Sequence, residues 1–393
     1  MKMQSIRDCS LLAGGARQGV KPMRKYSFDL NGPRGLAAFG IVMGHVAQAF
    51  ARYRFSHYDN RFILYIGDGF GVPCLFMFML LAGIANAMMK PPKLELREYL
   101  RFERKKFLQL FVPYLSVSLL TLVVKVLAPG KVITLSEAPY SVLYLFLAPR
   151  GGPSAHLWFL YWLMSVFVIW PFLKPVITRQ RLPFLLAASF LLAIQPIEWP
   201  TIGHGDKRYA LLGLPTLVQH FPVFVFGYYY GLKVMSRQQH YLRYIILTGI
   251  GFAGWMYVFF TYPVPESYGW AVGYRVTYLV GNTCAGLFLL WLVGLIAGQF
   301  KKARRITSYL AVRAYDVYLL HLAFAVHPIV FAMSRLRPDV IGTIALFIVA
   351  GIIAWLVSLF MGSAIRRIPI LGAVLLGVPM RRHPAKAGQA SKT

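Results

Sequence analysis

The chain has 393 residues, of which 58% are hydrophobic, and its mean hydropathy is +0.57. This composition excludes a soluble domain with a solvated surface, and its repeated apolar runs predict membrane-spanning helices. The net charge of +29 could indicate a nucleic-acid partner, but the Lys and Arg residues lie between the apolar runs rather than in one basic domain. The three cysteines do not have the spacing of a disulfide framework or a metal site. We therefore expect neither nucleic acid nor a bound metal.

Ten apolar segments predict an all-α integral membrane protein with about ten transmembrane helices. The two terminal segments and alternate connections between the spans together hold 29 of the 42 Lys and Arg residues. The positive-inside rule places these connections, and with them both termini, in the cytoplasm. The predicted segments are residues 30–51, 62–88, 107–128, 156–173, 183–197, 210–232, 244–262, 270–299, 310–333 and 340–363.

The chain divides into a basic cytoplasmic arm (1–27), a transmembrane domain (28–363) and a basic cytoplasmic tail (364–393). The arm lacks the apolar core and cleavage site of a signal peptide, so no cleaved leader is expected. In the tail, residues 365–379 are apolar but short. They are expected either to lie along the membrane interface or to form a frayed helix end.

The first apolar segment carries two ionisable residues, Arg34 and His45, which are eleven residues apart. Eleven residues make about three helical turns, so both side chains point to one face, about 16 Å apart. An ionisable residue inside a span is costly and indicates function by default. Two other interpretations stay open. Arg34 could be an interfacial cation whose head reaches the membrane surface, and His45 a core histidine bonded to a neighbouring helix.

Several segments, in chain order, resemble those of the acyltransferase-3 family of integral membrane acyltransferases. The first-helix motif of that family, Arg–ten residues–His, is matched by Arg34 and His45. The chain departs from the family pattern at Asn31, where an acidic residue is usual. The other resembling segments are residues 71–83, 105–114, 156–160, 221–227 and 315–321.

The resemblance implies an acyl-CoA-dependent O-acyltransferase in a bacterial inner membrane. It would move a short acyl group, acetyl or similar, from cytoplasmic acyl-CoA to a hydroxyl of an extracytoplasmic glycan or lipid-linked saccharide. Acyl-CoA would be a substrate rather than a permanently bound cofactor. The expected partners are this donor, the acceptor and membrane lipids, with a homo-oligomer left open.

Acyl transfer to a hydroxyl needs a base, charge or hydrogen-bond donors for the oxyanion, and a grip on the acyl carrier. His45 is the expected base, because its ordinary pKa lies near neutrality. Arg34 is expected to hold a phosphate or the thioester end of the donor, because guanidinium binds phosphate in a bidentate way. Arg104, Lys105 and Lys106 are expected either to contact the CoA phosphates or only to set the topology.

Further along the chain, candidate acceptor contacts begin with Asp68, an intramembrane carboxylate whose partner the sequence does not identify; Arg61 nearby is one candidate. His156 and Trp158 open the fourth span. They are expected to form either a saccharide platform or part of an interfacial aromatic belt.

Tyr318 and His321 are three residues apart on one face of the ninth span. They are expected either to line the substrate cavity or to make hydrogen bonds between helices. The same intramembrane charges would also suit a proton-coupled transporter, and a non-catalytic scaffold is a third class. The chain has no internal repeat of the kind that many transporters carry, which favours the enzyme.

Overall fold

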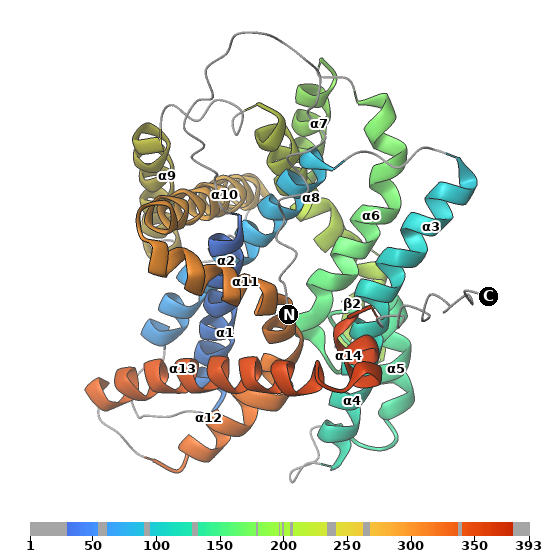
Figure 1. Cartoon of the computed structure of the whole chain (residues 1–393), viewed down its shortest axis with the longest axis vertical. Helices are drawn as coiled ribbons and strands as arrows, with labels where there is room; N and C mark the ends of the chain where they lie inside the picture. Colours follow the sequence, from blue (N-terminus) through green and yellow to red (C-terminus); the bar gives the residue numbers. More distant parts are fainter. Residues whose placement is uncertain are drawn as a thin grey trace, which may run out of the picture.

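The computed structural model describes eleven stretches of the chain, and these are almost entirely helical (Figure 1). The described residues are 30–53, 61–89, 95–127, 133–177, 180–195, 197–198, 200–204, 207–233, 241–261, 268–336 and 340–379. Their α-helices are α1 (Asn31–Tyr53), α2 (Arg61–Met88), α3 (Leu96–Lys106), α4 (Val112–Leu127), α5 (Ala138–Leu147), α6 (Trp158–Val176), α7 (Leu182–Ile194), α8 (Leu214–Lys233), α9 (Tyr241–Thr261), α10 (Tyr268–Gln299), α11 (Lys301–His321), α12 (His327–Met333), α13 (Val340–Ile365) and α14 (Pro369–Leu376).

Two of the long segments contain a turn of π-helix, which is rare and is often found at functional sites. One π-helix, η2 (Phe107–Phe111), joins α3 to α4, and the other, η5 (Leu322–Val326), joins α11 to α12. The remaining short elements are two 3₁₀ turns, η3 (Ala155–Leu157) and η4 (Leu211–Gly213), and an antiparallel hairpin of β1 (Thr201–His204) and β2 (Lys207–Ala210). Sequence analysis did not predict this hairpin.

The chain is an all-α, multi-pass integral membrane protein, as predicted. Eight helical segments of the described residues are long and apolar enough to cross a membrane. They are Gly69–Met88, Leu96–Leu127, Ala155–Lys174, Leu211–Leu232, Leu242–Thr261, Ala271–Ala297, Lys301–Met333 and Ile341–Ile365. The predicted number of ten and the cytoplasmic location of both termini stay predictions.

The two predicted spans outside this set are α1 and α7, each for a physical reason. Helix α7 has 13 residues, fewer than the roughly 20 that cross a bilayer. Helix α1 is long enough but carries polar residues along its length, among them Arg34, His45 and Arg52. It packs against α2, α10, α11 and α13, so neighbouring helices surround much of it. A helix inside the bundle can carry such residues at a lower cost than one that faces lipid.

Small residues let α1 approach α2 closely. A Cβ on Gly44 would lie 3.2 Å from both the carbonyl oxygen of Gly67 and the Cα of Gly71. Helix α2 approaches α8 in the same way, because a Cβ on Gly83 would collide with the backbone of α8. Such small-residue contacts are typical of helix packing in membranes. They fix the position of α1, and with it the position of His45.

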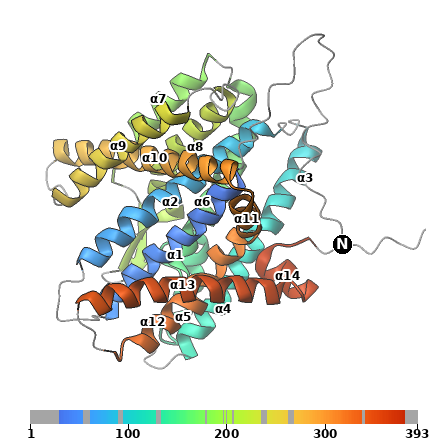
Figure 2. The same cartoon turned by 60° about the vertical axis from the view of Figure 1, so that its left-hand side comes forward.

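Helix α13 runs across the lower half of the molecule toward α14 in both views (Figures 1 and 2). Helix α14 packs against α4 and ends at Gly377, whose φ is 61°. A Cβ on Gly377 would meet the carbonyl oxygen of Gln109 at 2.6 Å, so glycine is needed both for space and for conformation. The segment 365–379 thus contains a packed helix rather than a frayed end. The predicted arm (1–27) and the end of the tail (380–393) lie outside the described residues.

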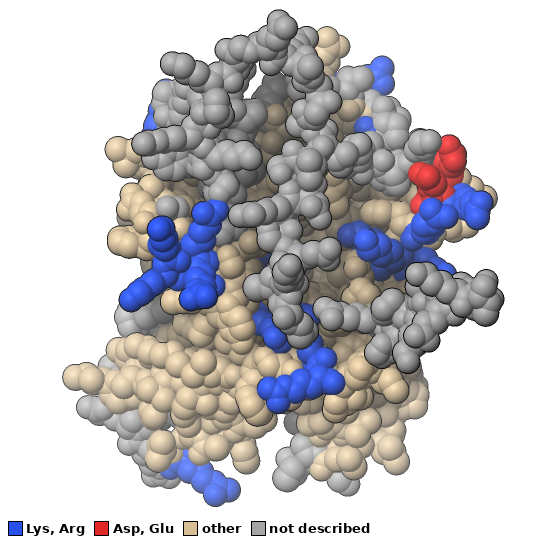
Figure 3. All heavy atoms as spheres, viewed as in Figure 1, with Lys and Arg blue, Asp and Glu red and all other residues tan. Residues whose placement is uncertain are grey.

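Lys and Arg residues gather in separate patches on the face shown in Figure 3, between areas of uncharged surface. Two exposed basic segments are the start of α11, which reads Lys301-Lys-Ala-Arg-Arg305, and helix α3. This pattern is typical of the ends of membrane helices.

Candidate active site

Three histidines from distant parts of the sequence come together in the bundle. His45 lies in the middle of α1, His156 lies in η3 just before α6, and His321 ends α11. The ring centroids are 5.2 Å apart for His45 and His321, 5.3 Å for His156 and His321, and 6.0 Å for His45 and His156. His156 and His321 are buried, whereas His45 is partly exposed. We call these three side chains the histidine cluster.

The histidine cluster borders a cavity of about 580 Å³, which we call the His45 cavity. His45 and His156 line it directly, and its other lining residues come from α1, α2, α4, η3 and the connection before it, the start of α6, η5 and the start of α12. Its polar and aromatic lining residues are His45, Gln48, Arg52, Lys125, Arg150, His156, Trp158 and His327.

Hydrogen bonds define the tautomers of two histidines in the cluster. The Nδ1 of His45 lies 3.1 Å from the amide oxygen of Gln48. Because that oxygen can only accept, Nδ1 carries the hydrogen, and Nε2 of the neutral ring keeps its lone pair. The Nδ1 of His321 donates in the same way to the main-chain oxygens of Val317 and Tyr318, at 3.0 and 2.9 Å. His45 thus has the tautomer that a general base requires.

Other ring nitrogens of the cluster are buried without a hydrogen bond. Within the described part of the chain, neither nitrogen of His156 has a partner, nor does Nε2 of His321. Buried polar atoms are almost always bonded, so exceptions point to a site that a ligand or water completes. The cluster therefore has free hydrogen-bonding capacity beside a cavity.

Arg34 lines a second cavity, of about 420 Å³, which we call the Arg34 cavity. Its polar lining residues include Lys106, Asn86, Tyr315 and Tyr318, while most of the remaining wall is aliphatic or aromatic. The two residues of the first-helix motif thus lie at two separate cavities. The spacing predicted that both side chains lie on one face of the helix. It did not show that neighbouring helices separate that face into two cavities.

Tyr318 belongs to the wall between the two cavities. Its side chain is buried and lines the Arg34 cavity. Its hydroxyl donates to the main-chain oxygen of His156, which lines the His45 cavity, at 2.7 Å. Tyr318 thus lines one cavity and bonds to the turn that borders the other, and its role in binding substrate stays a prediction.

A family model described as an acyltransferase domain, that of the acyltransferase-3 family, matches residues 28–362. The chain belongs to the acyltransferase-3 family. It is a membrane acyltransferase, and the matched range contains every lining residue of both cavities. A search of curated proteins and a search of solved structures each found no match.

Of the three basic residues predicted to contact the CoA phosphates of this acyltransferase, one lines a cavity and two do not. Lys106 lines the Arg34 cavity, and its ammonium lies 4.2 Å from the centroid of the Phe167 ring. Arg104 and Lys105 are exposed on α3, and neither lines that cavity. Their role in binding CoA stays a prediction, and the geometry favours Lys106 among the three.

The predicted acceptor contacts also differ in how well the structure describes them. Trp158 lines the His45 cavity, and the guanidinium carbon of Arg150 lies 4.6 Å from the centroid of its ring. Asp68 belongs to α2, but its side chain and that of Arg61 lie outside the described residues. Their pairing stays a prediction.

Sequence analysis missed three basic residues that line the His45 cavity: Arg52, Lys125 and Arg150. The sequence patterns assigned no role to any of the three. A signal was present for Arg52, because His45, Gln48 and Arg52 repeat at three- and four-residue steps and share one helix face. Lys125 and Arg150 gave no comparable signal, since tertiary packing brings them to the cavity.

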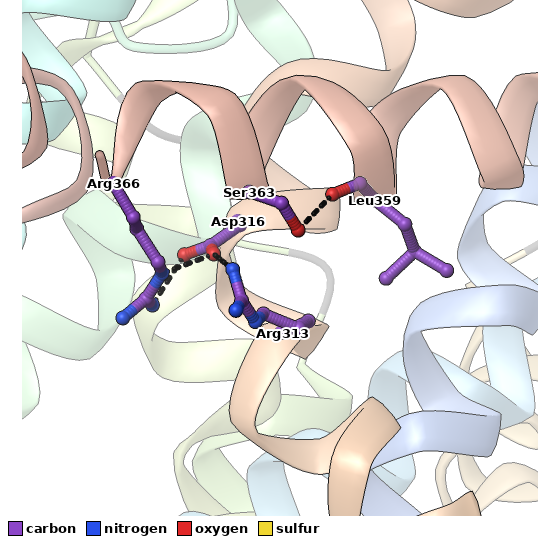
Figure 4. Close-up of polar contacts among 5 residues, drawn as sticks. All are labelled: Arg313, Asp316, Leu359, Ser363 and Arg366. Atoms are coloured by element: carbon purple, nitrogen blue, oxygen red, sulfur yellow. Dashed lines mark hydrogen bonds and ion pairs between the residues drawn. The ribbon is translucent and has the colours of Figure 1, made fainter. Parts of the chain in front are cut away.

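A buried ion pair, also missed, holds the segment that carries Tyr318 and His321 (Figure 4). The fully buried carboxylate of Asp316 in α11 accepts two hydrogen bonds from Arg366, from Nε at 2.5 Å and Nη2 at 2.7 Å. Arg313 approaches the same carboxylate at 3.9 Å. Arg366 immediately follows α13, so the pair ties α11 to the end of that helix. Asp316 thereby helps to position Tyr318 and His321, which follow it in α11.

Proposed function

We propose that this acyltransferase moves a short acyl group, acetyl or similar, from cytoplasmic acyl-CoA to a hydroxyl of an extracytoplasmic saccharide. In this proposal acyl-CoA binds at the Arg34 cavity and the acceptor binds at the His45 cavity. The enzyme would act in the inner membrane of a bacterium. The observation that supports it most strongly is the histidine cluster, whose unbonded ring nitrogens border a polar cavity inside an acyltransferase domain.

The contrast between the cavities fits the two substrates. Arg34 and Lys106 provide cations at a mainly apolar cavity, which suits the phosphates and the less polar pantetheine arm of CoA. The His45 cavity has aromatic and polar walls, which suit a saccharide. Tyr318 lies in the wall between them, so the thioester would have to pass this residue to reach His45.

The proposed reaction is a direct transfer. The acceptor hydroxyl gives its proton to Nε2 of His45 while its oxygen attacks the thioester carbonyl. When the tetrahedral intermediate collapses, the C–S bond breaks and CoA leaves as a thiolate, which takes the proton from His45. The products are an ester and free CoA, and His45 is neutral again. His156 is near enough to donate a hydrogen bond to the oxyanion.

The test is covalent transfer by the purified full-length protein. Labelled acetyl-CoA would be incubated with a panel of glycans, and the glycans would be analysed by mass spectrometry. We expect acylation by the native protein and a loss of about 100-fold or more in His45→Gln. His220→Gln is the control, because His220 is another histidine within a helix of the bundle, and it lines neither cavity.

Two outcomes would contradict the proposal. Near-native turnover by His45→Gln would exclude this residue as the base. Solute uptake without any covalent change would instead support the transporter considered from the sequence, against the family match.

A further inference from the structure

The His45 cavity carries an unusual concentration of positive charge for a saccharide site. Arg52 from the end of α1, Lys125 from the end of α4 and Arg150 from the connection before η3 all line it. Among the described lining residues there is no Asp or Glu, and none of the described ion pairs involves these three cations. We call Arg52, Lys125 and Arg150 the cation triad.

The triad comes from three separate elements, so the fold brings like charges together. Arg52, which is exposed, and Lys125, which is partly buried, line this cavity together with His327. Holding like charges together costs free energy unless an anion compensates them. An apolar helical protein that gathers three cations at one cavity thus has a site suited to an anionic group.

We infer that the acceptor is an anionic saccharide, whose phosphate or carboxylate binds the cation triad while its hydroxyl meets His45. This inference rests on the proposed function and narrows the acceptor class. A phosphate would occur in a lipid-linked saccharide and a carboxylate in a uronic acid, and both offer oxygens that guanidinium and ammonium groups bind well.

The placement of the triad also orients the acceptor. Arg52 follows His45 by seven residues, which is two helical turns, or about 10 Å along α1. The charged group therefore lies away from the hydroxyl that reacts. Arg150 packs on the ring of Trp158, so a saccharide ring on that indole would lie beside the anion site. The donor phosphates have their own cations, Arg34 and Lys106, at the other cavity.

The test separates anion binding from catalysis. Binding of inorganic pyrophosphate and of a uronic-acid oligosaccharide to the full-length protein in nanodiscs would be measured at several salt concentrations. We expect Lys125→Gln and Arg52→Gln each to weaken binding of at least one probe about 10-fold. Arg335→Gln is the matched control, because Arg335 is an exposed cation that lines neither cavity, and it should bind as the native protein does.

The second arm measures turnover with phosphorylated, uronic-acid and neutral acceptors of equal length. We expect the triad variants to raise the acceptor KM about 10-fold with the charged acceptors and to leave the acyl-CoA KM unchanged. Preference for one charged acceptor identifies phosphate or carboxylate as the source of the charge.

Several results would overturn the inference. They are equal binding by native and triad variants, an equal loss in Arg335→Gln, a raised acyl-CoA KM, or a neutral acceptor that the native protein prefers. If no acceptor is acylated but pyrophosphate binding still depends on the triad, the proposed acyl transfer fails while the anion site stands.

Discussion

The Asp316 ion pair and the histidine cluster both place polar groups inside an apolar helical bundle. The ion pair is hydrogen-bonded, whereas the cluster has ring nitrogens without partners. The carboxylate of Asp316 is paired with Arg366 through two short hydrogen bonds. In the cluster, both ring nitrogens of His156 and Nε2 of His321 lack partners within the described residues. Removing one partner of a buried ion pair is costly, so such a pair keeps its two helices together, whereas unsatisfied groups at a cavity are available to a ligand.

The two sites are connected through one helix. Asp316 precedes His321 by five residues in α11, and Tyr318 lies between them. The ion pair can therefore keep the cluster in place without touching a substrate. Substitutions at the two sites should separate these roles, because one should change the free energy of unfolding and the other the rate.

The largest effect is expected for His45→Gln. Loss of a general base lowers turnover about 10²- to 10⁴-fold. Because His45 is partly exposed to the cavity and glutamine keeps a polar side chain, the unfolding midpoint should stay close to that of the native protein. Steady-state kinetics and thermal unfolding of the same preparation would show whether rate and stability respond separately. A matching fall in the unfolding midpoint would show that His45 is a structural residue.

The next largest effect is expected for Asp316→Ala, because the partly buried Arg366 then lacks the carboxylate that compensates its charge. Breaking a buried pair on one side destabilises a protein by about 3–5 kcal/mol. The double variant Asp316→Ala, Arg366→Met should recover part of this loss, since the closest cation is removed and only the more distant Arg313 loses its partner. Denaturant unfolding in detergent measures both, and an Asp316→Ala protein as stable as the native one would contradict the structural role.

A smaller effect is expected for Arg34→Ala. Removing a charged hydrogen-bond donor costs about 1.5–3 kcal/mol, which is about a 10- to 100-fold rise in the KM for acyl-CoA. The KM for the acceptor should stay unchanged, because Arg34 lines the other cavity. A raised KM for the acceptor alone would show that Arg34 binds the acceptor rather than acyl-CoA.

The smallest effect is expected for Tyr318→Phe, which removes one hydrogen bond to the main-chain oxygen of His156. The free energy of unfolding should fall by about 1 kcal/mol. If the thioester passes this residue, turnover should change more than stability does, and Tyr315→Phe serves as a control. Tyr315 lines the same Arg34 cavity, but its hydroxyl donates to the main-chain oxygen of Gln109 rather than to that of His156. Equal kinetic changes in the two variants would argue against a special role for Tyr318.

Local sequence patterns predicted the positions of the helices, because helix formation depends on residues that are close together in the chain. Apolar runs gave most long helices to within a few residues, except where helix continues into a basic segment. Helix α3 extends the third predicted span back to Leu96, and α11 begins at Lys301 rather than near residue 310. The segment that carries Arg34 and His45 forms one helix, α1, as its apolar run predicted.

Features that arise only from packing were not predictable in this way. Arg366 is fifty residues from Asp316, so no local pattern pairs them. Lys125 lies near the end of α4, and only the packing of the helices places it at the His45 cavity. Helix α1 is polar for a span, and only its position among α2, α11 and α13 explains that composition.

The most direct test of the account is transfer between the two sides of a sealed membrane. The full-length protein would be reconstituted in liposomes that contain labelled acetyl-CoA, and an impermeant saccharide acceptor would be added outside. The account predicts labelled acceptor in this arrangement and none when donor and acceptor are both supplied only outside. Product formed only when both substrates are on the same side would contradict separate entry through the Arg34 and His45 cavities.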